Sequence, residues 1–280
     1  MSIIAFANRD RKETGQSLTA AVIAASIAIE HNYKVLLIST DFNDKTLENS
    51  FWANKQNGFL NSFMRSNSQD ISNGLEGLVR TFASNRASAD MIRSYTKPVL
   101  RDRLDVLPGP QTIDYKEYCL ISTYFSQIAD IANATYDLVI VDLSSDITIE
   151  NQKKLLNISS MVIMGLNQNQ TSINDFMDLK NENEFFKRNN VILSIGRYSS
   201  ISKYTNKNVA RYLREKDIPF IVPYNVQFAD SCSDGKIIDY LLSARTIKDR
   251  ENDECIFYST IKDTIDRIDY KRQEIEYAKI

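Results

Sequence analysis

Two short apolar runs near the start of the chain, with a polar loop and an alanine-rich segment between them, constrain its fold most strongly. The runs at residues 3–7 and 35–38 are hydrophobic on both faces and too short for helices, which is typical of central parallel strands. Residues 8–16 form a polar loop, and residues 17–31 have the Ala- and Ile-rich composition of a buried helix. This order of strand, loop, helix and strand predicts a βαβ unit.

The same alternation continues along the chain. Short apolar strands are predicted in the segments at residues 104–107, 136–142, 161–164 and 191–194, and a further apolar segment follows at residues 218–225. Amphipathic helices are predicted at residues 115–134, 172–188 and 207–216, and residues 57–101 are predicted to be mostly helical. Alternating strands and helices predict an α/β fold with a doubly wound, mainly parallel sheet and helices on both faces.

The loop of the βαβ unit matches a phosphate-binding P-loop in part. In the motif G-x-x-x-x-G-K-[ST], backbone N–H groups surround the phosphates, the lysine reaches the outer phosphates, and the Ser or Thr hydroxyl holds Mg²⁺. On this chain the motif places Asp10 at the first glycine, Gly15 at the second, Gln16 at the lysine and Ser17 at the hydroxyl. Taken alone, the match is also that of an ordinary helix start, because serine is a favoured N-cap.

From residue 3 to Asp41 the chain resembles the opening of the ParA/MinD class of ATPases. That class has a deviant Walker A loop, K-G-G-x-G-K-[ST], and a second strand that ends in D-x-D. In this register Arg11 stands where the class has its signature lysine, which crosses a dimer interface to the partner's nucleotide. Ser39 replaces the first Asp of D-x-D, and Asp41 matches the second, the class's candidate for ordering the attacking water.

Later segments resemble the family pattern in the same order. Residues 136–142 resemble the Walker B strand, in which Asp142 would support Mg²⁺ through water. Residues 218–225 resemble the I-P-Y-N segment that walls the adenine pocket, and the resemblance covers residues 2–242. Within the class, the likeness is greatest to the TadZ/CpaE group associated with Flp/Tad pilus assembly, through residues 223–240.

The resemblance implies a site for ATP and Mg²⁺ and a nucleotide-sandwich homodimer. Asp41 is the implied catalytic residue, and Ser17 and Asp142 are the implied Mg²⁺-binding residues, Asp142 through water. The implied nucleotide-binding residues are Arg11, Lys12, Glu13, Thr14, Gly15, Gln16, Ser17, Leu18, Asp142, Pro223, Tyr224 and Asn225.

Glutamine at position 16 changes the expected chemistry. A lysine there neutralises charge on the outer phosphates, and phosphoryl transfer depends on such stabilisation. An amide donates hydrogen bonds without charge, so at most weak ATPase activity is expected unless Lys12 or Arg11 substitutes. ATP binding can persist through backbone N–H groups, the helix N-terminus, Ser17 and Asp142. Two structural alternatives stay open: Asp142 as a loop-capping carboxylate, and Arg11 as part of a solvated charged loop.

The charge balance argues against DNA binding through bulk electrostatics, because the formal net charge is −2. A local basic patch stays open as an alternative. Its candidate residues are Lys187, Arg188, Arg197, Lys203, Lys207, Arg211, Arg214 and Lys216. The cysteines are few and scattered and His31 is the single histidine, which argues against metal clusters and disulfides.

No apolar run approaches the roughly 18 to 20 residues of a membrane span, and the N-terminus lacks the basic-then-apolar order of a signal peptide. A cytoplasmic protein is therefore expected. The ParA/MinD-like domain is predicted to span residues 1–245, and a C-terminal helical tail, 246–280, to pack on the same domain. The tail mixes acidic with basic residues, so contact with the domain or a partner is expected rather than with a membrane.

Three functional hypotheses follow. The main one is an ATP-dependent, dimeric positioning or scaffold factor for a pilus or secretion machine, acting on an assembly-machine partner. The second is a partitioning ATPase that binds DNA non-specifically as a dimer, which predicts a basic stripe and salt-sensitive binding. The third is an interaction module that binds no nucleotide, which predicts no thermal shift with ATP, ADP or Mg²⁺.

Overall fold

In the computed structural model, residues 2–9, 14–53, 74–84, 89–112 and 114–277 are described. The strands are β1 (Ser2–Asn8), β2 (Val35–Ser39), β3 (Lys97–Leu100), β4 (Leu104–Leu107), β5 (Leu138–Asp142), β6 (Met161–Leu166), β7 (Val191–Tyr198) and β8 (Phe220–Pro223). They form an eight-stranded sheet in the order β3-β4-β2-β5-β1-β6-β7-β8. All neighbours are parallel except β3, which runs antiparallel to β4 at one edge.

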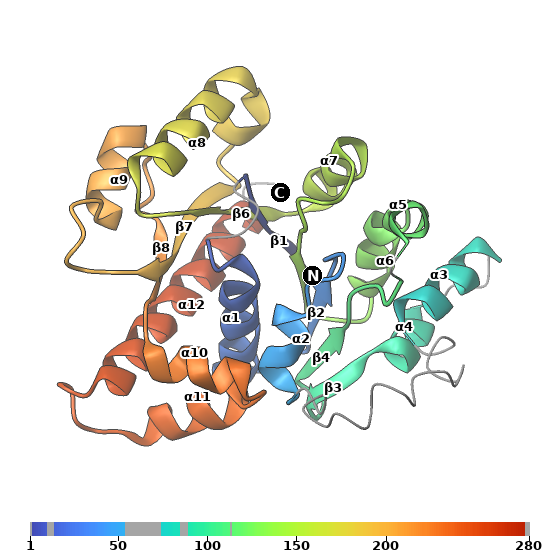
Figure 1. Cartoon of the computed structure of the whole chain (residues 1–280), viewed down its shortest axis with the longest axis horizontal. Helices are drawn as coiled ribbons and strands as arrows, with labels where there is room; N and C mark the ends of the chain where they lie inside the picture. Colours follow the sequence, from blue (N-terminus) through green and yellow to red (C-terminus); the bar gives the residue numbers. More distant parts are fainter. Residues whose placement is uncertain (1, 10–13, 54–73, 85–88, 113, 278–280) are drawn as a thin grey trace.

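Helices cover both faces of this sheet. They are α1 (Gln16–Glu30), α2 (Thr46–Phe51), α3 (Leu75–Ala83), α4 (Ala89–Tyr95), α5 (Tyr115–Ser122), α6 (Phe125–Ala132), α7 (Ile149–Ile158), α8 (Gln170–Glu182), α9 (Asn206–Leu213), α10 (Val226–Ser233), α11 (Ile237–Thr246) and α12 (Asp253–Tyr277). A short 3₁₀ helix, η2 (Glu184–Lys187), precedes β7. Figure 1 shows α1, α10, α11 and α12 grouped together, apart from α3 to α6. The predicted mainly parallel, doubly wound fold is confirmed.

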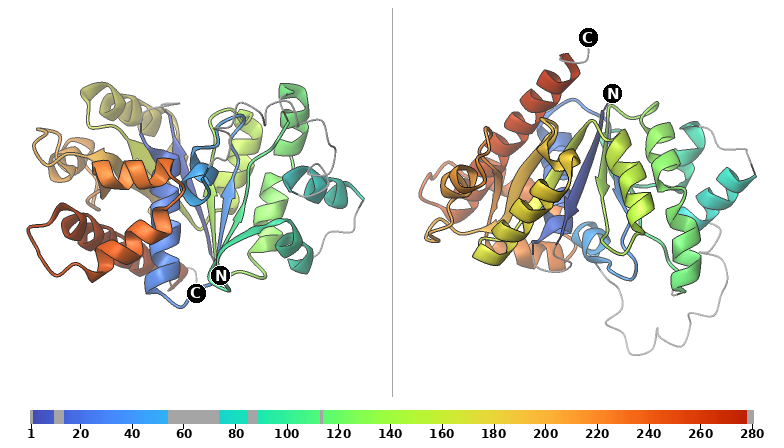
Figure 2. Two further views of the ribbon diagram at one scale, coloured as in Figure 1. Left: turned by 60° about the horizontal axis from the view of Figure 1, so that its bottom comes forward. Right: turned by 90° about the horizontal axis from the view of Figure 1, so that it is seen from above.

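Successive side chains along the strands point to opposite faces of the sheet and pack in two separate hydrophobic cores. On β1, Ile4 packs in one core and Ile3 in the other, and Leu37 and Leu36 divide in the same way on β2. One core joins the sheet to α1, α2, α10, α11 and α12, and the other joins it to α3 through α9. In both views of Figure 2 the C-terminal helix α12 and the helices α3 and α4 lie on opposite sides of the molecule. Strands apolar on both faces are thus explained by helices on both sides.

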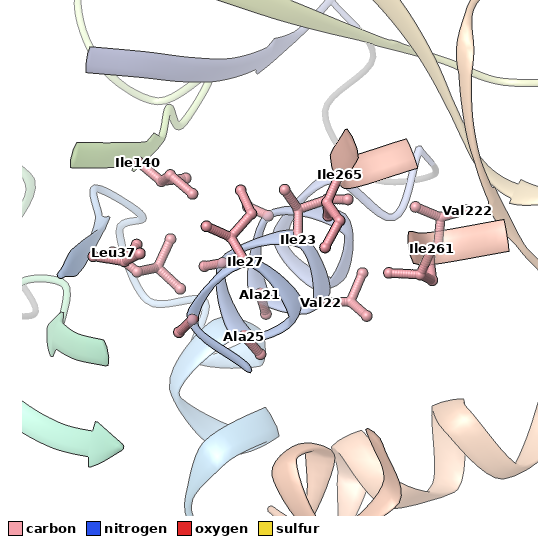
Figure 3. Close-up of a cluster of buried hydrophobic side chains, with 14 of the residues drawn as sticks. Ala21, Val22, Ile23, Ala25, Ile27, Leu37, Ile140, Val222, Ile261 and Ile265 are labelled. Atoms are coloured by element: carbon pink, nitrogen blue, oxygen red, sulfur yellow. The ribbon is translucent and has the colours of Figure 1, made fainter. Parts of the chain in front are cut away.

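Helix α1 is enclosed by the sheet on one side and by α12 on the other. Figure 3 shows Ile27 near Leu37 and Ile140 of the sheet, and Val22 near Ile261 of α12. Residues 19–28 of α1 are all buried, which explains why this helix is apolar around its whole circumference. The C-terminal helix therefore contributes to the same hydrophobic core as the phosphate-loop helix.

The polar side of α12 is joined to the rest of the molecule by ion pairs. Lys262 pairs with Glu30 of α1 at 3.3 Å, and Lys271 pairs with Asp217 at 3.0 Å. Arg272 pairs with Asp269 at 2.7 Å within the helix. Among the described helices, α12 included, none has the length and apolar character needed to cross a membrane.

The structure differs from the predicted elements in three places. The helix predicted over residues 172–188 is α8 and, after the extended Asn183, the 3₁₀ helix η2. The helix predicted over residues 115–134 is divided into α5 and α6, because Thr123 and Tyr124 make i→i−3 backbone hydrogen bonds to Leu120 and Ile121. The hydroxyl of Thr123 also donates to the carbonyl of Leu120, which competes with a continuous helix. Within the segment predicted as mostly helical, residues 97–100 form the antiparallel edge strand β3.

Candidate functional site

A cavity of about 620 Å³ opens where β1, β2, β5 and β7 end at the carboxyl edge of the sheet. Ligands of parallel α/β sheets bind at this edge, beside strands whose crossovers leave in opposite directions. The lining residues are Asn8, Thr14, Gly15, Gln16, Ser17, Leu18, Asp41, Phe42, Asn43, Asp44, Thr46, Leu143, Ser144, Ser145, Asp146 and Arg197. The cavity thus brings together the predicted site residues at 14–18 with Asp41, and Asp142 lies directly beneath them.

The end of the loop is held tightly against the sheet. Thr14 is buried, and its hydroxyl accepts a hydrogen bond from the side-chain amide of Asn8 at 2.9 Å. A Cβ added at Gly196 of β7 would lie 2.2 Å from the Thr14 carbonyl oxygen, so only glycine permits this approach. Gly15 then takes φ = 65° at the N-cap of α1, a left-handed conformation that favours glycine. The loop therefore enters α1 with its backbone N–H groups facing the cavity region.

Gln16 bonds to the Walker B-like strand. Its Nε2 atom donates to Asp142 Oδ1 at 2.6 Å and to the Leu143 carbonyl at 3.1 Å. Asp142 is fully buried, and its second oxygen, Oδ2, has no hydrogen-bond partner among the described residues. The side chain at the lysine position is thus fixed to the acidic residue that would support a cation, and one carboxylate oxygen is left to bind a further group.

Burial and neighbouring charges raise the pKa values of the two acidic residues at this edge. Burial, and next the charge of Asp142, raises the pKa of Asp41 well above its usual range. Burial also raises the pKa of Asp142, and the hydrogen bond from Gln16 opposes that shift. Asp44 and Glu48 raise both pKa values further. A bound cation would relieve this concentration of negative charge.

The charges around the cavity are unevenly distributed. Asp41, Asp44 and Asp146 line it, whereas Arg197 is the one cation among the lining residues that the structure describes. Lys45 lies nearby, but its Nζ donates to the Pro110 carbonyl at 2.7 Å. The sequence placed Arg197 in a basic patch for DNA. The structure places it at the cavity instead, and a glycine followed by arginine at the end of a strand is only a faint signal for that position.

The residues predicted to wall an adenine pocket do not line this cavity. Pro223 ends β8, Tyr224 is exposed and Asn225 is the N-cap of α10. The Asn225 side-chain oxygen accepts from the Phe228 N–H at 2.8 Å and from the Tyr240 hydroxyl at 3.2 Å. The Tyr224 N–H donates to the Tyr198 carbonyl, which joins this segment to the end of β7. Arg11, Lys12 and Glu13 lie outside the described residues.

The donor set fits a nucleotide better than a metal ion bound by the protein alone. Within the described ranges, no group of three or more His, Cys, Asp or Glu side chains could hold a metal ion. The cavity instead combines a glycine-ended loop, a helix N-terminus and the Ser17 position, and the buried Asp142, which bonds to Gln16 of the lining, has one oxygen without a partner among the described residues. This combination suits a phosphate tail with Mg²⁺, because Mg²⁺ is usually held by few carboxylates together with phosphates and water.

Comparison with known proteins gives similarity in structure rather than in sequence. No protein-family model matches the chain, and no curated protein is significantly similar to it. A ParA family ATPase from Chlorobium tepidum has a TM-score of 0.68 at 18% identity, over 96% of this chain and 98% of that one. A chain of the MinC:MinD cell division protein complex from Aquifex aeolicus has a TM-score of 0.62 at 17% identity, over 96% of this chain and 95% of that one.

A plasmid partition protein from Borrelia burgdorferi, solved with AMPPNP, has a TM-score of 0.57 at 17% identity, over 100% of this chain and 99% of that chain. These structures extend over almost the whole of each partner, so the likeness includes both layers of helices as well as the sheet. The chain therefore has the fold of ParA/MinD-type P-loop ATPases.

Proposed function

We propose that this protein binds ATP and Mg²⁺ in the cavity at residues 14–18 and uses binding, rather than rapid turnover, to control dimerisation. The observation that carries this proposal is the 2.6 Å hydrogen bond from Gln16 to Asp142. It fixes a neutral side chain where P-loop enzymes have a lysine for the outer phosphates. The loop, helix N-terminus and acidic residues around it are those that a nucleotide would need.

Each part of the site has a role in this proposal. Backbone N–H groups at the start of α1 would bind phosphates, Ser17 would hold Mg²⁺, and Asp142 would support the ion through water. Asp41 lines the cavity and would orient a water molecule. The metal ion would supply charge neutralisation for the phosphates. Without a lysine at position 16, hydrolysis is slow and the bound state persists.

The biological role proposed is positioning or scaffolding in a pilus or secretion machine. It rests on the resemblance of residues 223–240 to the TadZ/CpaE group and on the names of similar structures, which include a MinC:MinD cell division complex. In this role the nucleotide-bound homodimer recruits an assembly-machine protein, and ATP stabilises the dimer. Arg11 would reach the nucleotide of the partner subunit in such a dimer.

Replacement of Gln16 tests the proposal directly. Steady-state ATP turnover is measured for the wild type, for Gln16→Lys and for the exposed control Gln273→Lys. We expect turnover in the wild type and the control to be near the detection limit, and Gln16→Lys to raise it by about tenfold or more, because it restores a charge that stabilises the transition state. Rapid hydrolysis by the wild type that Gln16→Lys does not raise would contradict the proposal.

A second candidate function, DNA binding by a partitioning ATPase, is favoured by one observation. Lys207, Arg211 and Arg214 follow one another along one face of α9 and its C-cap, and all three are exposed. A similar structure is that of a plasmid partition protein. This candidate predicts ATP-dependent DNA binding that weakens steeply with salt and is reduced by Arg211→Ala. Absence of a mobility shift at low salt would exclude it.

A further inference from the structure

Arg197 occupies an unusual backbone position at the end of β7. Its φ is 50°, in the left-handed region that few non-glycine residues adopt. The pairing of β7 with β8 shifts register between Ile195 and Tyr198, so the strand is irregular at this point. An irregular strand end can direct a side chain where a regular strand would not. The strand end is therefore shaped locally around Arg197.

The irregular end of β7 packs against the loop that precedes α1. Gly196, the residue before Arg197, packs so closely on the Thr14 carbonyl that a Cβ would lie 2.2 Å from it. The stem of Arg197 in turn lies across Gly15, with Cγ 3.4 Å and Nε 3.5 Å from the position of a Cβ there. Loop and strand end thus form one unit, in which the arginine side chain extends over the N-terminus of α1.

The positive charge of Arg197 at the N-terminus of α1 favours a bound anion. The N-terminus of a helix is the positive end of its dipole, where cations are disfavoured and anions are bound. Arg197 is exposed and makes no hydrogen bond or ion pair with any residue in the described part of the chain. It nevertheless lines the cavity beside residues 14–18. A positive side chain without a partner, held over a helix N-terminus, has the arrangement of a phosphate-binding site.

An independent observation comes from Asp142, which is bonded to Gln16 of the cavity lining. Asp142 lies fully buried beneath the loop, and its Oδ2 atom has no hydrogen-bond partner among the described residues. Its Oδ1 atom accepts the hydrogen bond from Gln16, so the side-chain amide at the lysine position is bound to a protein carboxylate. The acidic side of the site therefore lacks a cation, and the phosphate side lacks the usual lysine.

We propose that Arg197 supplies, from the end of β7, the positive charge that the loop lacks at Gln16, and that it binds the phosphate groups of the nucleotide. This inference rests on the proposed nucleotide site and extends it by naming the residue that recognises the anion. A guanidinium is suited to this role, because it remains charged and donates two parallel hydrogen bonds to a phosphate. Arg197 binds ground-state phosphate and thus accounts for affinity without rapid hydrolysis.

The test uses calorimetric titration of the full chain with ATP, adenosine and inorganic tripolyphosphate. Arg197→Asn removes the charge and keeps a residue that tolerates positive φ, Arg197→Lys keeps the charge, and Arg250→Ala removes an exposed charge elsewhere. We expect Arg197→Asn to weaken ATP and tripolyphosphate binding by about ten- to hundredfold and to leave adenosine unchanged, because a charged hydrogen bond is lost. Arg197→Lys should retain part of the affinity, because it keeps the charge without the two parallel hydrogen bonds, and Arg250→Ala should stay near the wild-type affinity.

A rescue variant sharpens the result. In the double variant Arg197→Asn/Gln16→Lys, the restored loop lysine should recover most of the lost tripolyphosphate affinity. If Arg197→Asn bound tripolyphosphate and ATP as tightly as the wild type does, the assignment of Arg197 would be overturned, while the proposed nucleotide function would stand. Binding of tripolyphosphate through Arg197 without any binding of ATP would support Arg197 and overturn the nucleotide function. Binding of neither ligand by the wild type would overturn both.

Discussion

Gln16 has a neutral amide at the position where a P-loop has the ammonium group of a lysine. This difference determines which partner the side chain binds. Gln16 donates to Asp142 and to the Leu143 carbonyl, so its hydrogen atoms are satisfied within the protein. A lysine at this site would meet a buried carboxylate on one side and incoming phosphates on the other. In the proposed function, Gln16 would therefore separate two properties that a P-loop lysine combines, namely nucleotide binding and charge stabilisation during hydrolysis.

The acidic pair gives a prediction for stability against pH. Both native pKa values lie above the ordinary value of 3.8, so between that value and the native pKa values the folded state binds more protons than the unfolded state. The free energy of unfolding should therefore fall as pH rises above about 4, by at most about 1.4 kcal/mol per pH unit for each proton. Denaturant unfolding of the ligand-free protein at several pH values measures this slope.

Two variants assign the slope to the pair. Asp142→Asn should flatten it, because one titrating group and its repulsion of Asp41 are removed together. Asp263→Asn, a change at an exposed position of α12, should leave it as in the wild type. An unchanged slope in Asp142→Asn would show that the buried pair does not control the pH dependence.

The N-cap role of Asn225 can be tested without a nucleotide. Its side-chain oxygen caps α10 through the Phe228 N–H, so Asn225→Ala should lower the free energy of unfolding by about 1 kcal/mol. Asn225→Asp keeps an oxygen acceptor and should retain most of that stability. Chemical denaturation of the two variants without ligand is the measurement, and equal losses in both would argue against the cap.

Among the elements, α12 is the one whose contribution is tested most simply. Ile265 is 0% exposed against α1 and the sheet, whereas Ile256 on the same helix is 45% exposed. We expect Ile265→Ala to cost about 2 to 4 kcal/mol, because it leaves a cavity in the core, and Ile256→Ala to cost less than about 1 kcal/mol. Urea unfolding of both variants checks this, and equal costs would mean that α12 does not stabilise the main core.

Elements with a strong local pattern could be predicted from the sequence. The strands near residues 35–38 and 138–142 are buried on both faces, and α1 is an uninterrupted apolar segment, so periodicity and length identify them. Their order also gave the parallel, doubly wound fold. The loop at residues 14–18 could be placed at the carboxyl edge for the same reason, because each parallel strand ends there.

The remaining features depend on contacts between distant residues. Arg197 reaches the cavity only because Gly196 packs on Thr14, which lies far away in the sequence. The edge strand at residues 97–100 is short and contains Pro98, so its pairing with β4 leaves little local signal. The division between α5 and α6 follows from competing hydrogen bonds of Thr123. None of these contacts has a characteristic spacing in the sequence.

For the whole molecule, we propose that a nucleotide site without its lysine still controls dimerisation. The fold is that of ParA/MinD-type ATPases, and the cavity lies at the carboxyl edge of the sheet, where residues 14–18 and Asp41 meet. Ligand binding to the folded state also raises its stability through mass action. Nucleotide binding, dimer formation and thermal stabilisation should therefore occur together over the same range of ATP concentration.

The measurement that tests this claim most directly is a calorimetric titration of the purified wild-type protein with Mg-ATP, with its molar mass followed by light scattering in the same solutions. The account predicts saturable binding accompanied by a change from monomer to dimer, despite Gln16. Absence of ATP binding, or binding without any change in mass, would contradict it, and the first of these results would favour an interaction module that uses the fold without a nucleotide.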